Sequence, residues 1–269
     1  LSSAASDVYK RQGAERRAAM LRSIIIAFST YSKIPMPGVK WEERSMRYSM
    51  CFFPLVGVVM GLCSLGVLYG MRMLGFGTTA RAAVLTILPL LITGGIHMDG
   101  FLDTMDAKSS YKSREEKLAI LKDPHIGAFG VICVGIYLIL YLGLMSEMDE
   151  KNMIFLALGY VNERILSGFS VVTFQKARKD GMAADTARAS QQGVKWILAV
   201  EGILCAVFYL YLDPWTGMVC ILVGLLVFLY YRFMAYRIFG GITGDLAGYF
   251  LQMCELLLLA GIVMKGKLL

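Results

Sequence analysis

The chain is poor in charged residues. Only 17% of its 269 residues are Asp, Glu, Lys or Arg, whereas 57% are hydrophobic. Soluble globular domains carry about 25% charged and about 45–50% apolar residues. The mean hydropathy is +0.60. This composition excludes an ordinary soluble enzyme, which would not need six or seven apolar runs of near-membrane length. We therefore expect an all-α, polytopic integral membrane helical bundle.

Paired cysteine motifs are also missing. The chain has six cysteines, none of them in a CxxC pair, and most of them lie inside apolar runs. They are typical of small buried hydrophobes, which excludes a disulfide framework or a cysteine zinc site. No soluble domain, long linker or internal repeat is recognisable. The net charge of +7 indicates the cytoplasmic loops of a membrane protein rather than binding to nucleic acid.

The N-terminus lacks the apolar core of a signal peptide. Residues 1–12 are polar and without pattern, and Met20 would make a natural start. We expect residues 1–19 to be a non-native or disordered leader and residues 20–269 to form a single membrane-embedded domain.

Long apolar runs predict about six to seven transmembrane helices. The run at 82–96 is short, and we expect it to continue as helix into the residues that follow. Residues 23–31 are too few to span a bilayer and predict an interfacial or re-entrant helix. The predicted spans are residues 51–70, 82–96, 127–146, 153–174, 196–212, 217–239 and 246–264.

Basic residues alternate between the predicted loops. The segments before the first span, after the second and after the fourth are rich in Lys and Arg, and the intervening loops are poor in them. The positive-inside rule then places the N-terminus and the loops that carry motifs in the cytoplasm. Seven spans would leave the C-terminus on the other side.

Three carboxylates follow the second apolar run at the spacing i, i+4 and i+7: Asp99, Asp103 and Asp106. A helix would place them on one narrow stripe, where like charges repel unless a cation lies between them. Hard oxygen ligands suit Mg²⁺ or Mn²⁺, and such cations commonly serve phosphate chemistry. The alternative is a solvated acidic helix end. We favour the metal site, because carboxylates near membrane depth are costly and tend to be functional.

Two neighbours of this stripe are candidates as well. His97 would be a general base, a metal ligand or a plain interfacial residue. Gly100 would let a backbone approach closely, which suits a bound phosphate or a tight helix contact.

A glycine-rich turn with the sequence GGITGD occupies residues 240–245. Gly241, Thr243 and Gly244 would expose the N–H groups of the following helix to an anion, with Asp245 at the helix start. The alternative is an ordinary turn with Asp245 as the helix cap. A polar stripe continues from Asp245 to Glu255, which lies deep in an apolar run and therefore needs a partner.

Further charged residues lie within or beside spans. Glu163 and Arg164 are adjacent, so on a helix we expect them to point in different directions and to meet neighbouring helices. Arg164 is a candidate phosphate clamp or one half of a structural ion pair.

Two basic loop segments add candidate anion ligands. Residues 176–181, with Arg178, would bind anionic lipid headgroups or a polyanionic substrate. Lys122 and Asp123 are candidate substrate ligands, although our default expectation is that Asp123 caps the third span and that Pro124 lies in its first turn.

Several of these stretches together resemble the cobalamin synthase family, the adenosylcobinamide-GDP ribazoletransferases. They are GGIHMDGFLDTMD at 94–106, LKD at 121–123 and GGITGD at 240–245, supported by IPMP at 34–37 and FPLVG at 53–57. The likeness runs from about residue 24 to the end. Phe101-Leu102 and Pro124-His125 depart from the residues expected of the family.

The resemblance implies that a ribose hydroxyl of α-ribazole or its 5′-phosphate attacks the cobinamide-side phosphorus of adenosylcobinamide-GDP and that GMP leaves. It implies Mg²⁺ as cofactor and a bacterial or archaeal inner membrane, with the active site facing the cytoplasm. Asp99, Asp103, Asp106 and Asp245 would hold metal and pyrophosphate, and one of them would act as the base. The substrate ligands would come from His97, Gly100, Lys122, Asp123, Arg164, Arg178, Gly241, Thr243, Gly244 and Glu255. The sequence is compatible with a homo-oligomer and does not decide the oligomeric state.

Two rival functions remain at this point. A CDP-alcohol lipid phosphotransferase runs the same chemistry, but its Asp-Gly is followed shortly by Ala-Arg, which this chain lacks. An ion-coupled transporter would use Asp99, Asp103, Glu163 and Glu255 as a relay, but transporters often contain inverted repeats.

Overall fold

The computed structural model describes residues 2–268, apart from the side chains of residues 2–16, 43 and 44. The described chain is helical and has no β-strand, which confirms the predicted fold class. A single isolated bridge joins Lys176 to Ile242. The helices are α1 (Ser2–Tyr31), α2 (Glu43–Met46), α3 (Ser49–Met73), α4 (Thr78–Thr93), α5 (Ile96–Ser109), α6 (Arg114–Ile120), α7 (Ala128–Glu147), α8 (Met153–Thr173), α9 (Met182–Ala189), α10 (Val194–Leu212), α11 (Pro214–Met234) and α12 (Gly244–Leu268), with the short turns η1 (Glu150–Asn152) and η2 (Ala235–Phe239).

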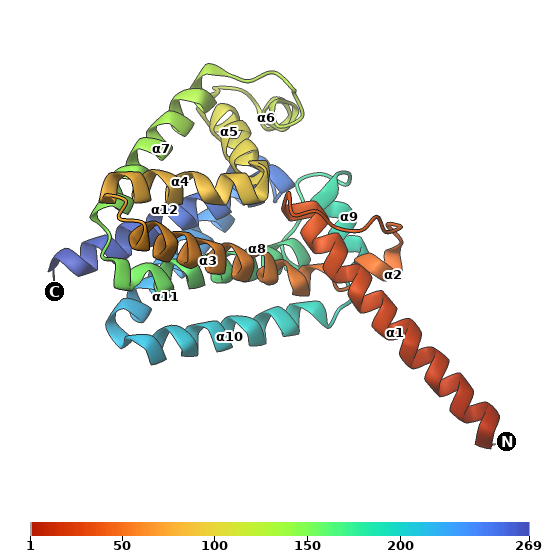
Figure 1. Ribbon diagram of the computed structural model, residues 1–269. Coiled ribbons are helices and arrows are strands. Elements are labelled where there is room, and N and C mark those ends of the chain that lie inside the picture. Colours follow the sequence, from red (N-terminus) through yellow and green to blue (C-terminus); the bar gives the residue numbers. More distant parts are fainter. Residues whose placement is uncertain (1, 269) are drawn as a thin grey trace.

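The bundle is built around α8, which packs against α3, α10 and α12 (Figure 1). Small residues allow the closest of these contacts. A Cβ atom on Gly61 would lie 3.0 Å from Ala157, and one on Gly57 would collide with the backbone of Tyr160. Lipid tails are as apolar as the helices, so there is little hydrophobic driving force between helices in a membrane. Close backbone packing of this kind therefore stabilises a membrane bundle. The N-terminal half of α1 projects away from the bundle (Figure 1).

Five helices are long and apolar enough to cross a membrane: α3, α7, α10, the continuous α11–η2 segment and α12. The bent pair α4 and α5 would make a sixth. Helix α8 forms where a span was predicted. It is not among the candidates because Asn162, Glu163 and Arg164 lower its mean hydropathy. Neighbouring helices bury the side chains of Glu163 and Arg164.

The prediction that the second span continues as one helix into the aspartate motif is wrong, because the helix is broken between Thr93 and Ile96. Helix α4 ends at Thr93, and the axis turns by 94° before α5. Gly94 and Gly95 both adopt the left-handed conformation, with φ of 67° and 77°. Two such residues in succession end a right-handed helix, and glycine adopts this conformation without a Cβ penalty. The aspartates therefore lie on a separate helix that turns away from α4 (Figure 1).

The two ends of the bundle carry different loops. Lys265 pairs with Asp213 at 3.3 Å and Lys267 with Glu147 at 2.6 Å, so the C-terminus lies at the end that holds the α7–α8 and α10–α11 connections. The motif loops lie at the opposite end (Figure 1). This arrangement agrees with seven crossings of the bundle by α3, α4, α7, α8, α10, α11 and α12.

Helix α1 contains the short helix predicted at 23–31 and begins earlier, at Ser2. Most side chains of the predicted leader, residues 1–19, lie outside the described residues. The assignment of that leader stays a prediction.

Candidate active site

The aspartate motif meets the glycine-rich turn where α5 crosses α12. A Cβ on Gly100 would lie 2.7 Å from the carbonyl oxygen of Asp245, and one on Gly248 would lie 3.0 Å from that of His97. The two helices thus touch backbone to backbone, and any larger residue would push them apart. The close contact predicted for Gly100 is therefore to a helix, and it brings the aspartates to the start of α12.

The glycine-rich turn also pairs with the basic segment that follows α8. The N–H of Ile242 donates to the carbonyl of Gln175 at 2.9 Å, and the N–H of Ala177 donates to the carbonyl of Ile242 at 2.9 Å. Gly241 makes this possible, since a Cβ there would lie 2.6 Å from the Gln175 oxygen. Two motifs about sixty residues apart are thereby joined.

Thr243 rather than Asp245 caps α12. Its hydroxyl oxygen accepts the N–H of Leu246 at 3.2 Å and donates to the Asp245 carboxylate at 3.2 Å. The other neighbour of that carboxylate is Arg178, whose Nη2 lies 3.1 Å from Asp245 Oδ2. The half-buried carboxylate of Asp245 is therefore positioned by Thr243 and Arg178 and does not cap the helix.

A basic pocket of about 260 Å³ lies beside this pair, and Lys122, Lys176 and Arg178 all line it. Lys122 Nζ is 2.7 Å from Asp180 Oδ2, and this contact holds the pKa of the Asp180 carboxyl below its usual range. Burial lowers the pKa of the Lys176 amine to about 8. The pocket thus gathers three cationic groups together with the carboxylates of Asp180 and Asp245, which leaves one positive charge in excess.

Arg178 has hydrogen-bond donors that no group in the described part of the chain uses. Its Nε and Nη1 are buried and have no hydrogen-bond partner among the described residues. A guanidinium offers a rigid fork of donors that suits phosphate oxygens, and leaving buried donors unpaired costs free energy. The arrangement is typical of a site for an anion, which fits a polyanionic substrate and an anionic lipid headgroup alike, so the role of Arg178 as a substrate ligand stays a prediction.

A second, largely apolar cavity of about 140 Å³ adjoins the basic pocket. Gly244 and Asp245 line both spaces. Asp99 and His97 line the apolar cavity as well. Carboxylates from α5 and α12 therefore lie where an apolar space and a cationic space meet.

The carboxylates of this junction fit a hard divalent cation in their chemistry. Asp99, Asp106 and Asp245 are close enough for their charges to repel the carboxylate of Asp103. Within the described residues, no three Asp, Glu, His or Cys side chains converge in a geometry that would already hold a metal ion. Asp99, Asp103 and Asp245 supply oxygen ligands of the kind that Mg²⁺ prefers, so the metal stays a prediction for these three residues.

Asp106 is engaged elsewhere. Its two carboxylate oxygens accept the backbone N–H groups of Gly127 and Gly130 at 2.9 and 2.8 Å. It therefore caps the N-terminus of α7, a position that also suits its negative charge. Its predicted role as a metal ligand is untested, but the structure gives it this structural one.

This finding corrects the role expected of Asp123. The Asp123 carboxylate accepts the N–H of His125 at 3.0 Å instead of capping α7. Pro124 lies in the preceding turn and not in the first turn of the helix, which begins at Ala128. A carboxylate from another helix has taken the cap position, which no local pattern around residue 123 could indicate.

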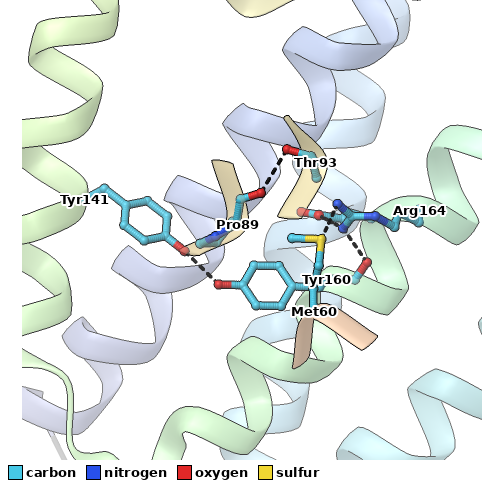
Figure 2. A network of polar contacts seen from close by, with 7 residues as sticks. Met60, Pro89, Thr93, Tyr141, Tyr160 and Arg164 are labelled. Carbon is cyan, nitrogen blue, oxygen red and sulfur yellow. Dashed lines mark hydrogen bonds and ion pairs between the residues drawn. The ribbon is translucent and has the colours of Figure 1, made fainter. Parts of the chain in front are cut away.

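Arg164 and Glu255 lie away from both spaces. Glu163 and Arg164 do not simply point apart as expected, since Arg164 Nη1 donates to Glu163 Oε1. The expectation that Arg164 meets a neighbouring helix is confirmed by its contact with Met60 of α3. The long guanidinium stem bends back along the helix, which adjacency on the backbone does not prevent. Figure 2 shows the contacts of Arg164 with the sulfur of Met60 and with the carbonyl oxygen of Tyr160, which accepts from Arg164 Nη1 at 2.8 Å. Glu255 of α12 is close enough for the Arg164 charge to act on it.

Some residues at the site were not predicted from the sequence. Lys176 was recognised only as part of a basic run. Tyr31 and Phe53 line the apolar cavity but lie in apolar segments, where an aromatic residue gives no signal of its own.

The chain is similar to known proteins over nearly its whole length. Residues 23–263 match the family described as cobalamin-5-phosphate synthase. The adenosylcobinamide-GDP ribazoletransferase of Lachnoclostridium phytofermentans is 46% identical over 91% of this chain and 95% of that relative. Relatives of the same name from Desulfitobacterium hafniense and Chlorobaculum tepidum are 30% and 32% identical, over 90% and 92% of this chain and 96% and 98% of their own lengths. No solved structure matches the chain. The chain belongs to the cobalamin-5-phosphate synthase family.

Proposed function

We propose that the protein is an adenosylcobinamide-GDP ribazoletransferase. A ribose hydroxyl oxygen of α-ribazole, or of its 5′-phosphate, forms a bond to the cobinamide-side phosphorus of adenosylcobinamide-GDP. The bond from that phosphorus to the oxygen of GMP breaks, and GMP leaves with the electron pair. The products are adenosylcobalamin, or its 5′-phosphate, and GMP, and the proton of the attacking hydroxyl is released.

The observation that carries this proposal is the junction of two unlike spaces at Asp245. The basic pocket has the charge to bind a pyrophosphate, and the apolar cavity could accept an uncharged co-substrate. Asp99 and Asp245 stand where the two reactants would meet. The names of the relatives, which span nearly the whole chain, support the same reaction.

The basic residues would bind the departing nucleotide. Arg178 has two unpartnered donors for phosphate oxygens, and Lys122 and Lys176 line the same pocket. Positive charge held at the leaving group stabilises the negative charge that develops there in the transition state. A carboxylate of the site would take the proton of the attacking hydroxyl, within reach of the apolar cavity.

Mg²⁺ would be held by oxygens of Asp99, Asp103 and Asp245. When bound, it would supply charge neutralisation for the pyrophosphate. In its absence these carboxylates would repel the anionic substrate.

We also propose that the site faces the cytoplasm of a bacterial or archaeal inner membrane. The motif loops, which lie together at one end of the bundle, are the basic ones. The positive-inside rule places such loops in the cytoplasm.

The test is GMP release and cobalamin formation by the protein purified in detergent with adenosylcobinamide-GDP, α-ribazole and Mg²⁺. We expect turnover that requires the metal and falls by about 10²–10⁴-fold in Asp103→Asn, as is typical when a charged catalytic group is lost. Asp149→Asn is the matched control, because this exposed aspartate lies in the α7–α8 connection at the opposite end.

Absence of turnover in folded wild-type protein, or full activity of Asp103→Asn, would contradict the proposal. Transfer from a CDP-alcohol to a lipid acceptor instead would favour the phosphotransferase alternative. Ion flux into vesicles without nucleotide would favour the transporter.

A further inference from the structure

The apolar cavity at the site has a composition of its own. It lies between α1, α3, α5, α8, α9 and α12, and its walls are mostly aliphatic and aromatic. Its volume of about 140 Å³ is well below the roughly 300 Å³ at which pockets for whole drug-sized ligands begin. It is therefore too small for a complete nucleotide or a corrinoid and suits one flat ring system.

Aromatic rings from three different helices gather on one side of this cavity. The rings of Tyr31 and Phe53 have centroids 4.2 Å apart, and the imidazole of His97 lies 6.2 Å from the first and 6.0 Å from the second. Stacked and tilted rings at such spacings favour contact with a further aromatic ring over contact with a flexible chain.

The cavity offers one conspicuous unsatisfied polar atom. His97 is 4% exposed, and its Nε2 has no hydrogen-bond partner among the described residues. A buried polar atom without a partner costs free energy that a ligand can recover. In the tautomer that carries a proton on Nε2, the imidazole donates to a ring nitrogen with a free lone pair.

We propose that this cavity binds the benzimidazole base of the ribazole co-substrate. This inference rests on the proposed function. The base is a flat bicyclic ring with one free ring nitrogen, which matches an apolar cavity with one free donor. Guanine and adenine, the bases of the other substrate, carry several polar edge groups that the apolar walls would leave unpaired.

The position of the cavity supports the same assignment. Its boundary with the basic pocket is formed by Gly244 and Asp245, and Asp99 lies on its wall. A base seated inside would place the attached ribose at these carboxylates. The attacking hydroxyl would then stand beside the pocket that holds the pyrophosphate, as an in-line displacement requires.

The test begins with wild-type protein and free 5,6-dimethylbenzimidazole as an inhibitor. We expect inhibition that is competitive against α-ribazole and not competitive against adenosylcobinamide-GDP. In His97→Phe, which keeps a ring and loses the donor, the KM for α-ribazole and the inhibition constant of the base should both rise about tenfold. The KM for adenosylcobinamide-GDP should stay within about twofold.

Phe155→Leu is the matched control, because this buried ring stacks on Tyr209 and does not line the cavity. It should leave both constants unchanged. A merely structural role of His97 would instead alter both KM values or only the yield of folded protein. If His97→Phe does not fold, Phe53→Leu takes its place with the same expected increase.

Competition of the base against the corrinoid, or equal effects on both KM values, would overturn the inference while leaving the transferase activity standing. If wild-type protein releases no GMP, the proposed function fails, and calorimetric binding of the base to wild-type, His97→Phe and Phe155→Leu protein then decides the inference alone. Equal affinity in all three would overturn it.

Discussion

Acidic side chains gather at two places in this bundle, and their surroundings differ. Asp99, Asp103 and Asp245, the junction carboxylates, are exposed or half-buried, and two of them line open spaces. Glu163 and Glu255 surround Arg164 in the interior, and all three are almost completely buried. We call these three residues the sealed cluster. Both groups looked functional in the sequence, because charge in an apolar segment is costly.

The comparison teaches that cost alone does not identify a catalytic charge. In the sealed cluster, Arg164 donates to Glu163 and to the carbonyl oxygen of Tyr160 and contacts the sulfur of Met60 (Figure 2). Glu163 Oε2 and Arg164 Nε have no hydrogen-bond partner among the described residues, but these side chains line neither of the two spaces at the site. The junction carboxylates have no such arrangement. Only Asp245 among them has a cationic partner within the described residues, and the Arg178 that provides it keeps two donors unused. Both groups contain unpaired polar atoms, so a position beside a cavity, rather than incomplete pairing, is the better indicator of chemistry.

The largest expected effect is on stability and comes from a substitution that breaks the sealed cluster. Arg164→Met should lower the free energy of unfolding by about 3–5 kcal/mol, because removing one partner leaves the remaining buried charge uncompensated. Thermal unfolding in detergent measures the loss. The protein that remains folded should still release GMP, and a specific loss of turnover without loss of stability would contradict the division between the two groups.

A smaller effect is expected where the basic pocket loses its fork of donors. Arg178→Met should raise the KM for adenosylcobinamide-GDP by about 10–100-fold, since hydrogen bonds to charged groups are worth about 1.5–3 kcal/mol. Steady-state GMP release measures it. Lys179→Met is the matched control, because Lys179 is exposed and does not line the pocket. An equal increase in KM for both variants would mean that the positive charge of this segment attracts anions in general and that Arg178 does not bind the substrate specifically.

Asp106 tests the distinction between catalytic and structural carboxylates, because it belongs to the aspartate stripe but caps α7. Asp106→Asn should lower the free energy of unfolding by about 1 kcal/mol and leave the Mg²⁺ concentration for half-maximal activity unchanged. Asp213→Asn is the matched control, since Asp213 caps α11 through the N–H of Thr216 at 2.9 Å. A several-fold increase in the Mg²⁺ requirement of Asp106→Asn alone would make Asp106 a metal ligand after all.

The smallest expected effect is on pH dependence. The pKa of Lys176 is lowered to about 8 by burial, so the amine is protonated below that pH and neutral above it. The KM for the anionic substrate should therefore rise a few-fold between pH 7 and pH 9, because one positive charge is lost from the pocket. Lys176→Arg should remove this dependence, since a guanidinium stays charged. An unchanged profile in that variant would exclude Lys176 as its cause.

Much of the fold could be predicted from the sequence. The hydrophobic runs place α3, α7, α8, α10, α11 and α12 within a few residues of their bounds, because a lipid-exposed helix must be apolar along its length. The bend before α5 was not predicted, although Gly94 and Gly95 open the motif at 94–106. Their left-handed conformation depends on how α5 packs against α12, which the local sequence does not reveal.

The motifs of the site could be predicted from the sequence, but the contacts that each motif makes with other segments could not. The aspartate stripe, the glycine-rich turn and Arg178 were all found from spacing and residue type. The cap on α7 comes from Asp106 and the pairing of the turn with residues 175–177 comes from tertiary contacts, so neither has a local signal. The aromatic wall of the cavity is built from three helices and could be assembled only in three dimensions.

The most direct test compares Asp99→Asn with Glu163→Gln in GMP release per folded molecule. Both substitutions replace a carboxyl group by an amide and keep the shape of the side chain. We expect Asp99→Asn to lose about 10²–10⁴-fold in turnover and Glu163→Gln to stay within about threefold of wild type. Equal loss in both variants, or the greater loss in Glu163→Gln, would contradict the assignment of the chemistry to the junction carboxylates.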